Sequence, residues 1–233
     1  MNIRQARLYN QHLCNNSLVS TEAVVRHFGA VQAQDYAASV WGIGLRLPNA
    51  TLQVVEQSIY DRRIVRSWTM RGTIHFAPAE DVGWMVENFA KPRNASFLNG
   101  HLKKIGLTLP ILEQSRKVLE RELVGQCLTR PEIYEQLEQA GIKKVRDWGL
   151  HIIGYWAQEG LLCIAPHRGK QVTIALLDDW IPRQRKLSAE EATLSLPSAI
   201  SRAIAQPHHK ILLGGQGCPW AKPEPPSSQF LGW

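Results

Sequence analysis

Residues 129–177 decide the fold class, and they read T-R-P-E-I-Y-E-Q-L-E-Q-A-G-I-K-K-V-R-D-W-G-L-H-I-I-G-Y-W-A-Q-E-G-L-L-C-I-A-P-H-R-G-K-Q-V-T-I-A-L-L. Thr129 and Glu132 have the spacing of a capping box, in which two side chains satisfy backbone N–H groups at the start of a helix. The pattern predicts a helix over 131–140. Gly141 then follows, a residue suited to the position just after a helix end.

A second helix and a hairpin complete this unit. The helix is expected over 145–159, and two β-rich runs, 161–166 and 171–177, flank the turn H-R-G-K. Helix, turn, helix and hairpin in this order are typical of a winged helix, a variant of the helix-turn-helix.

The beginning of the chain repeats this order. Helices are predicted over 2–13, from the capping pair Ser20-Thr21 to Gly29, and from Thr51 onward. The stretch R-R-I-V-R-S-W-T-M-R-G-T-I-H-F-A-P is expected to form a hairpin that turns at M-R-G. The sequence therefore predicts a mostly α fold with small β-hairpins, of the α+β class, built from tandem winged-helix modules.

These elements divide the chain into modules. We expect a first winged-helix module at 1–90, a helical connector at 91–125 and a second winged-helix module at 126–194. Within this frame, helices are predicted over 79–90 and about 110–124, and a polar stretch, K-P-R-N-A-S-F-L-N-G-H-L-K-K, joins them.

Composition limits the class of protein. The 44% hydrophobic content is ordinary for a globular chain, no apolar run is long enough for a bilayer, and the charged N-terminus lacks the apolar segment of a signal peptide. Four scattered cysteines without a C-x-x-C pair are expected to be free thiols in a reducing cytoplasm. The histidines have no metal-binding spacing, so neither a metal nor a cofactor is expected.

The charge balance points to a polyanionic partner. The chain has 27 basic and 20 acidic residues, a net charge of +7, and released counterions make nucleic acid a favourable partner for such a protein. Cations gather before the second helix of the 126–194 module and at its hairpin turn, where a winged helix meets phosphates. A solvated basic face is the alternative. These candidate DNA-binding residues are Lys143, Lys144, Arg146, Arg168 and Lys170.

A pair of amides interrupts the apolar stretch G-A-V-Q-A-Q-D at 29–35. Residues two positions apart share a face on an extended chain and not on a helix. Gln32 and Gln34 therefore act on one ligand only if the backbone is extended there or lies at a helix end. Gly29 permits such a break. Judged by pattern alone, buried hydrogen bonding is the ordinary role of such glutamines.

Three stretches resemble the AlkZ-like winged-helix DNA glycosylases, bacterial enzymes that unhook bulky N-alkylpurines and interstrand crosslinks. They read V-Q-A-Q-D-Y-A-A-S-V-W-G-I-G-L-R-L, I-V-R-S-W-T-M-R-G-T-I-H-F and G-K-Q-V-T-I-A-L-L-D-D-W. The resemblance runs from near the N-terminus to about Leu194. The family's catalytic signature is Gln–any–Gln, and Gln32-Ala33-Gln34 matches it. The resemblance implies a C-shaped stack of winged-helix modules around a DNA channel.

The resemblance also bears on the end of the chain. The family continues past Leu194 with a further winged-helix module, whereas residues 195–233 are rich in Pro, Gly and Ser with no clear period. In the frame that joins each codon's third base to the next two, Leu196–Ile204 and His209–Pro223 can spell the helix-rich text expected there. We therefore expect a frameshift near Leu194–Leu196 and a non-native tail, which gene sequencing tests.

Glutamine suits this chemistry because an N-alkylated purine is already a cation and leaves readily. The resemblance assigns catalysis to Gln32 and Gln34. Their amide oxygens can hold water and face the positive charge that develops on the sugar. Asp35 is a candidate electrostatic helper. Because full flipping of a crosslinked base is sterically impossible, an open groove is expected rather than the closed pocket of other glycosylases.

The first hairpin adds the candidate DNA contacts Arg66, Arg71 and His75, of which Arg71 stands at the turn. The expected partner is double-stranded DNA carrying alkyl lesions. The protein is expected to act as a cytoplasmic, nucleoid-associated monomer without membrane contact. The alternative function is a non-catalytic winged-helix DNA-binding protein, either a regulator or a degenerate relative; a pseudogene product is a third reading.

Overall fold

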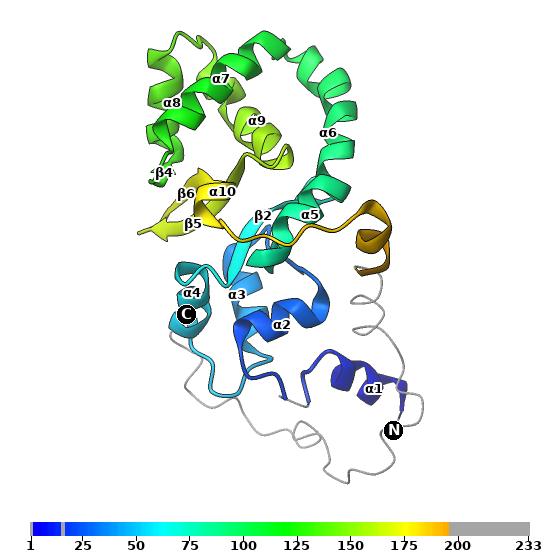
Figure 1. Ribbon diagram of the computed structural model, residues 1–233. Coiled ribbons are helices and arrows are strands. Elements are labelled where there is room, and N and C mark those ends of the chain that lie inside the picture. Colours follow the sequence, from blue (N-terminus) through cyan, green and yellow to red (C-terminus); the bar gives the residue numbers. More distant parts are fainter. Residues whose placement is uncertain (1, 15–16, 196–233) are drawn as a thin grey trace.

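The computed structural model describes residues 2–14 and 17–195. The expected non-native tail, 195–233, lies outside this range except for its first residue. In Figure 1 the strands lie between α1–α4 below and α6–α9 above.

Four short helices build the lower half, and each begins at a capping side chain. The caps are Asn2, Ser20, Asp35 and Thr51, and each accepts a hydrogen bond from a backbone N–H three residues further on. The helices that they start are α1 (Ile3–Asn10), α2 (Thr21–Phe28), α3 (Tyr36–Gly44) and α4 (Leu52–Tyr60). The helices predicted from residues 2, 21 and 51 are confirmed in position.

The six strands of the described residues form one antiparallel sheet with the order β1-β3-β2-β5-β6-β4. Both predicted hairpins are present, as β2–β3 and β5–β6. They join edge to edge through the pair Arg66↔Ile164. The strands are β1 (Val31–Gln32), β2 (Ile64–Met70), β3 (Thr73–Pro78), β4 (Leu128–Thr129), β5 (Leu162–Arg168) and β6 (Gln171–Leu176).

The segment that follows β3, including the predicted polar connector, is mostly helical. A 3-10 turn (Ala79–Asp81), α5 (Val82–Met85), a π-helical turn (Val86–Ala90), α6 (Lys91–Phe97), a second π-helical turn (Leu98–Leu102) and α7 (Leu109–Glu122) follow one another. Pro92 is the second residue of α6, just beyond the first π-helical turn, a wide turn that leaves room where proline lacks an N–H. Asn94 is buried and donates to the carbonyl of Tyr155, at 3.1 Å, and to Glu159.

The remaining helices follow the predicted boundaries closely. The capping box is confirmed: the Thr129 side chain and backbone both bond to Glu132, at the start of α8 (Arg130–Gln139). Gly141 has a positive φ of 89° directly after the helix. Next come α9 (Val145–Gln158) and, after the second hairpin, α10 (Leu177–Trp180).

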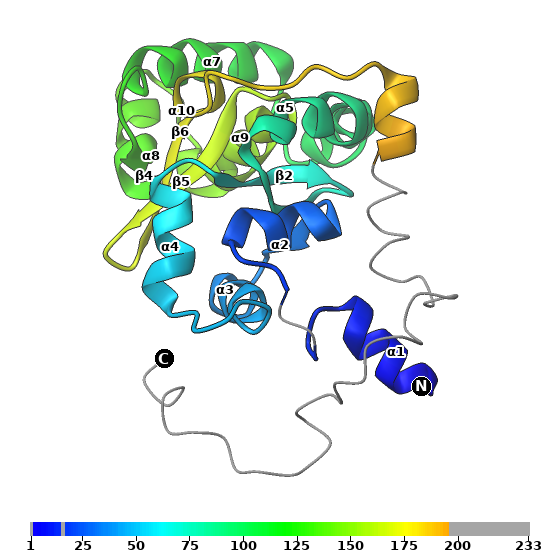
Figure 2. The ribbon, with the colours of Figure 1, turned by 60° about the horizontal axis from the view of Figure 1, so that its bottom comes forward.

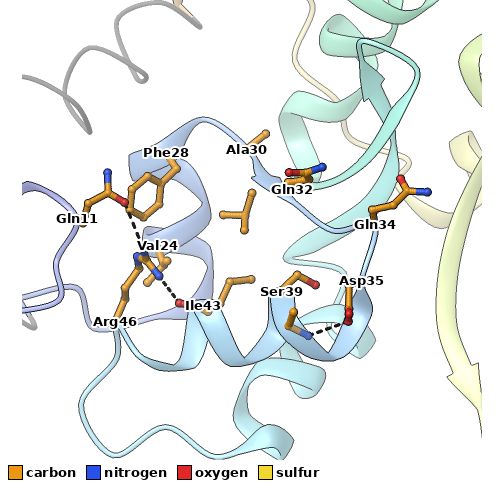
Figure 3. A pocket seen from close by; sticks show the side chains of 13 residues that line it. Gln11, Val24, Phe28, Ala30, Gln32, Gln34, Asp35, Ser39, Ile43 and Arg46 are labelled. Carbon is orange, nitrogen blue, oxygen red and sulfur yellow. Dashed lines mark hydrogen bonds between the residues drawn. The ribbon is translucent and has the colours of Figure 1, made fainter. Parts of the chain in front are cut away.

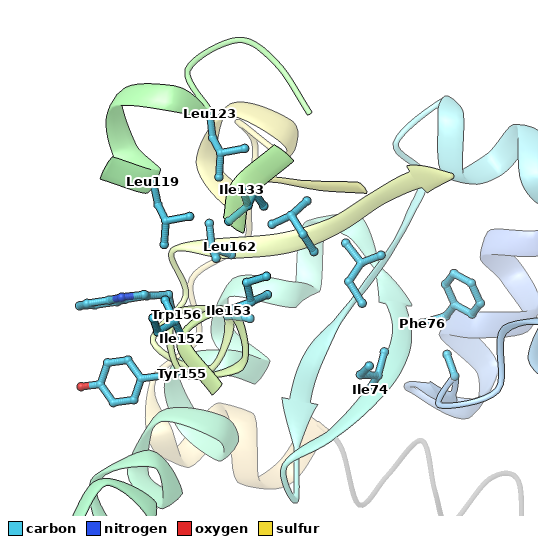
Figure 4. Packing of buried hydrophobic residues seen from close by; sticks show 14 of the residues in the cluster. Ile74, Phe76, Leu119, Leu123, Ile133, Ile152, Ile153, Tyr155, Trp156 and Leu162 are labelled. Carbon is cyan, nitrogen blue, oxygen red and sulfur yellow. The ribbon is translucent and has the colours of Figure 1, made fainter. Parts of the chain in front are cut away.

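One hydrophobic cluster extends through both predicted modules. Phe76 from the lower half and Ile152 from the upper half are fully buried in it (Figure 4). So are Ile43 from the lower half and Leu137 from the upper half. Figure 2 shows α2 and α5 on opposite sides of β2. A second buried hydrophobic cluster includes Val65 of β2. The fold-class prediction of helices with small antiparallel hairpins is confirmed. The winged-helix classification of each module stays a prediction, and the two modules share a sheet and a core.

Cysteine chemistry differs in part from expectation. Cys127 and Cys163 are free thiols, and burial raises the pKa of Cys163 far above its usual value. Cys14 is disulfide-bonded, so the expectation of a free thiol is wrong for this residue, because the lack of a C-x-x-C pair in the sequence does not exclude a disulfide. Among the residues that the structure describes, no helix is long and apolar enough to cross a membrane, and no three His, Cys, Asp or Glu side chains gather as metal ligands.

Candidate functional site

The two glutamines lie on an extended edge of the sheet. Gly29 ends α2 with a positive φ of 76°, and the chain then pairs with β3 through Val31↔Phe76 and Gln32↔His75. Ala33 is fully buried, whereas Gln32 and Gln34 are both exposed. The two amides therefore share one face, as an extended backbone requires, and they are not buried hydrogen-bond formers.

Hydrogen bonds from β3 orient Gln34 and leave Gln32 free. The N–H of Ala33 donates to the carbonyl of Ile74 at 2.8 Å, and the N–H of Ile74 donates to Oε1 of Gln34 at 3.2 Å. Because Oε1 must accept this bond, the Gln34 NH₂ group points away from the sheet edge. Within residues 2–14 and 17–195, the Gln32 side chain makes no hydrogen bond, so its amide is available to a ligand.

Arg66 holds the backbone between the glutamines from behind. Its side chain is buried, its Nε and Nη2 donate to the carbonyl of Ala33 at 3.0 and 2.7 Å, and Nη2 also reaches the carbonyl of Gln34 at 3.4 Å. Burial lowers the pKa of Arg66, and no carboxylate of the described residues forms an ion pair with it. This placement favours a positioning role over the predicted DNA contact.

Tyr36 packs against the Arg66 guanidinium, which lies 5.3 Å from the ring centroid. The Tyr36 hydroxyl donates to Glu56 at 3.0 Å, and its ring contacts the His167 ring at a tilt of 39°, with centroids 4.1 Å apart. Burial and the bond to Glu56 raise the pKa of Tyr36 well above its usual value. The tyrosine therefore stays protonated and braces the arginine without bringing a second charge.

The other residues predicted around the glutamines differ in exposure. Asp35 is exposed, but its carboxylate caps α3 by accepting from the N–H of Ala38 at 3.0 Å, which already explains an acidic residue there. His75 is buried, and burial lowers its pKa, so it is neutral at pH 7. Arg71 is exposed at the hairpin turn with φ of 56°, beside Gly72 with φ of 71°. Of the three predicted contacts on this hairpin, Arg71 is the one open to a ligand.

Three pockets adjoin one another along this face. The first, of about 610 Å³, lies between α2, β1 and α3 and includes Gln32 and Gln34 (Figure 3). The second, of about 520 Å³, lies between the sheet and α9, and Gln34 and Arg66 also line it. The third, of about 530 Å³, lies beside α8 and the second hairpin, and shares Arg130 with the second. A continuous surface thus runs from the glutamines to the second hairpin.

The predicted basic residues are only partly brought together. Arg146 and Lys170 line the third pocket with Arg130, which sequence reasoning missed because the capping box explained its segment. Arg168 is bonded to Glu132 and to the carbonyl of Cys127, each at 2.7 Å. Lys143 and Lys144 are exposed before α9, and the Lys144 ammonium lies 5.6 Å from the Trp148 ring centroid.

Arg146→Ala and Lys170→Ala are expected to weaken DNA binding at low salt and to reduce the salt dependence of log Kd by about one unit of slope each. Arg168→Ala is the matched control from the same hairpin. Because Arg168 is already engaged by Glu132, we expect a smaller change in slope. Fluorescence anisotropy with a labelled duplex between low and physiological salt measures both, and equal slopes for all three variants contradict the assignment.

Comparisons with known proteins show what this chain is similar to. Residues 25–206 match the family model described as DNA glycosylase AlkZ-like. The chain is 25% identical over 177 residues to an interstrand DNA cross-link repair glycosylase of Streptomyces sahachiroi, across 73% of this chain and 47% of that protein. It is also similar in structure to the Streptomyces sahachiroi DNA glycosylase AlkZ, with a TM-score of 0.72 and 23% identity over 88% of this chain and 57% of that one. The chain spans about half the length of these relatives.

Proposed function

The chain belongs to the AlkZ-like family of DNA glycosylases, and from this premise we propose that it hydrolyses the N-glycosidic bond of cationic N-alkylated purines or crosslinked bases in DNA repair. The observation that carries the proposal is the pair of exposed amides, Gln32 and Gln34, on one face of an extended segment that β3 and Arg66 hold in place.

The reaction needs little acid catalysis because the damaged base carries a positive charge before it leaves. Departure returns the base to neutrality and moves positive charge onto the sugar. A group that stabilises this charge and positions water then supplies the remaining rate enhancement. One preorganised group of this type contributes roughly 10²–10³ in rate, or about 3–4 kcal/mol. This is enough for a charged lesion and too little for an intact purine.

The two amides divide this work according to their hydrogen bonds. Gln32 makes no bond within the described residues, so we assign to it the attacking water and the developing sugar cation, which its oxygen faces. Oε1 of Gln34 is engaged by the N–H of Ile74, which turns the NH₂ group outward. We assign to this NH₂ group the anchoring of a sugar or phosphate oxygen. Neutral His75 opposite Gln32 adds no repulsive charge.

The exposed position of both amides favours an open groove over a closed pocket for a flipped base. A duplex that lies across the three adjoining pockets contacts Arg130, Arg146 and Lys170 at one end while the lesion meets Gln32 and Gln34 at the other. Asp35 contributes to catalysis only through its fixed negative charge at the start of α3. Double-stranded DNA with alkyl lesions is the proposed partner. We propose that the protein acts as a monomer on the nucleoid in the cytoplasm, without metal or cofactor.

Release of a free base from methylated DNA tests this function. The full chain is incubated with a duplex containing 7-methylguanine, and the liberated base is measured by chromatography against the spontaneous rate. Gln53→Ala, an exposed change on α4 away from the pockets, serves as the surface control and should match the unmodified protein. A non-catalytic DNA-binding protein would retain the duplex and release base only at the spontaneous rate, which would reject the proposal.

A further inference from the structure

Helix α9 is buried except along one edge. Of its 14 residues, three are exposed: Arg146, Asp147 and Leu150. Other helices hold its buried side. The Trp156 indole N–H donates to Oγ of Ser115 in α7 at 3.0 Å, and a Cβ at Gly149 would collide with the ring of Tyr134 in α8. Because these contacts fix the helix from behind, its exposed edge has a defined position.

Leu150 is the apolar residue of this edge, and it is 56% exposed. Residues four apart lie on one face of a helix, so Arg146 precedes Leu150 on this face and Gly154 follows it. Space is open beside Gly154, since nothing among the described residues outside its own helix would lie within 4 Å of a Cβ there. The Gln158 side chain folds back to donate to the Gly154 carbonyl at 3.1 Å. The surface beyond Leu150 is therefore low, and the leucine projects from it.

This edge faces the path proposed for the duplex. Leu150 and Gln34 line the same pocket, of about 520 Å³, between α9 and the sheet. Arg130 lines that pocket and also the adjoining one, where Arg146 and Lys170 add two cations. Phosphates are the groups that such cations hold. An exposed apolar side chain between the cations and the amide lies where the bases of a bound duplex would pass.

We propose that Leu150 is an apolar wedge, which inserts between base pairs beside the damaged nucleotide and unstacks them. Leucine is one of the side chains that DNA-binding proteins insert into base steps in this way. The inference rests on the proposed glycosylase function and adds a positioning residue to it. Both glutamines are exposed rather than enclosed, so water must reach the damaged nucleotide within the duplex. A wedge beside Gln34 opens the stack at that place.

Fluorescence of a base analogue tests the insertion directly. Two duplexes carry a 7-methylguanine on a 2′-fluorinated sugar, which resists cleavage, with 2-aminopurine on its 5′ or its 3′ side. The emission of 2-aminopurine rises when it leaves the stack. At saturating protein we expect the unmodified chain to raise the emission in at least one duplex, and Leu150→Ala to leave it near that of the free duplex. Leu150→Met, which keeps an apolar side chain of similar volume, should raise it again.

The matched control is Leu109→Ala. Leu109 is 52% exposed, lies at the start of α7 and lines none of the three pockets. Its removal should leave the rise in emission unchanged. Since alanine is a good helix former and both positions are exposed, both variants should fold, which circular dichroism verifies.

Base release separates the wedge from a general loss of binding. We expect Leu150→Ala to lower kcat/KM for 7-methylguanine about tenfold in a matched duplex and less in one with a mismatch beside the lesion, because a mismatched step is already easier to unstack. Leu150→Lys should bind DNA more tightly at low salt, since it adds a cation, yet release the base as slowly as Leu150→Ala. Equal losses in the matched and mismatched duplexes, or rates that follow affinity, overturn the inference.

The two assays also distinguish this inference from the proposed function. If the unmodified chain raises the emission through Leu150 but releases no base, the glycosylase proposal fails and the wedge stands. If it releases the base without raising the emission on either side of the lesion, the wedge fails and the glycosylase proposal stands.

Discussion

The Gln32→Ala protein is expected to release 7-methylguanine about 10²–10³-fold more slowly than the unmodified protein while melting at the same temperature. The two effects separate because Gln32 is exposed and makes no hydrogen bond within the described residues, so its removal costs the fold nothing. Release of the free base measures the activity, and circular dichroism on heating measures the stability.

Gln34→Ala should lose activity to a similar degree and also some stability. Its Oε1 accepts from the N–H of Ile74, and losing a bond of this type costs about 1 kcal/mol. In the double variant we expect losses smaller than the product of the single ones, because both amides act on one reacting centre. Release at the unmodified rate by the double variant would contradict the catalytic assignment, with Gln53→Ala excluding a general surface effect.

Arg66→Ala is expected to lower both the stability of the fold and the activity of the site. Arg66 is only 6% exposed, and its guanidinium supplies the bonds to the carbonyls of Ala33 and Gln34. Hydrogen bonds from a charged donor contribute about 1.5–3 kcal/mol, so unfolding free energy should fall by about this amount. Without these hydrogen bonds, the backbone of residues 32–34 no longer aligns Gln32 with Gln34. We expect a loss of kcat of about 10²-fold, since misplacement by about 1 Å has this effect.

Two comparisons separate positioning from general destabilisation. Adding guanidinium at millimolar concentration should restore part of the activity of Arg66→Ala, whereas Arg66→Lys keeps a charge but lacks the planar fork and should remain impaired. The control is Arg63→Ala. Arg63 is exposed, lies just before the same strand and forms an ion pair with Asp61 at 3.1 Å. If the activity of Arg66→Ala falls only in proportion to its unfolded fraction and guanidinium has no effect, the arginine merely supports the fold.

Local signals in the sequence predicted the elements well. The capping box at Thr129, the break at Gly29 and the turn at Arg71-Gly72 each depend on a few neighbouring residues, and each is present. Asp35 carried such a signal too, because an aspartate just before a helical run is a favoured cap. It was interpreted through its nearness to the glutamines instead.

Contacts between distant segments were beyond the same reasoning. An arginine in a hairpin near a DNA-binding motif is ordinarily expected to contact phosphates, and nothing local indicates that Arg66 instead bonds to Ala33, 33 residues earlier. Likewise, the pair Arg66↔Ile164 joins strands from the two predicted modules, which sequence patterns treat separately. The exposed glutamines also reverse what periodicity alone suggested, because edge pairing with β3 leaves alternate side chains open to solvent.

The pair Arg66↔Ile164 has a consequence for how a duplex would lie on the proposed site. The main chain of Arg66 pairs the first hairpin with the second, and its side chain donates to the backbone between the two glutamines. These two contacts therefore fix the distance between the second hairpin, β5–β6, and the pair Gln32 and Gln34. In the proposed complex, the contacts of the phosphates with the second hairpin therefore determine which nucleotide meets the glutamines.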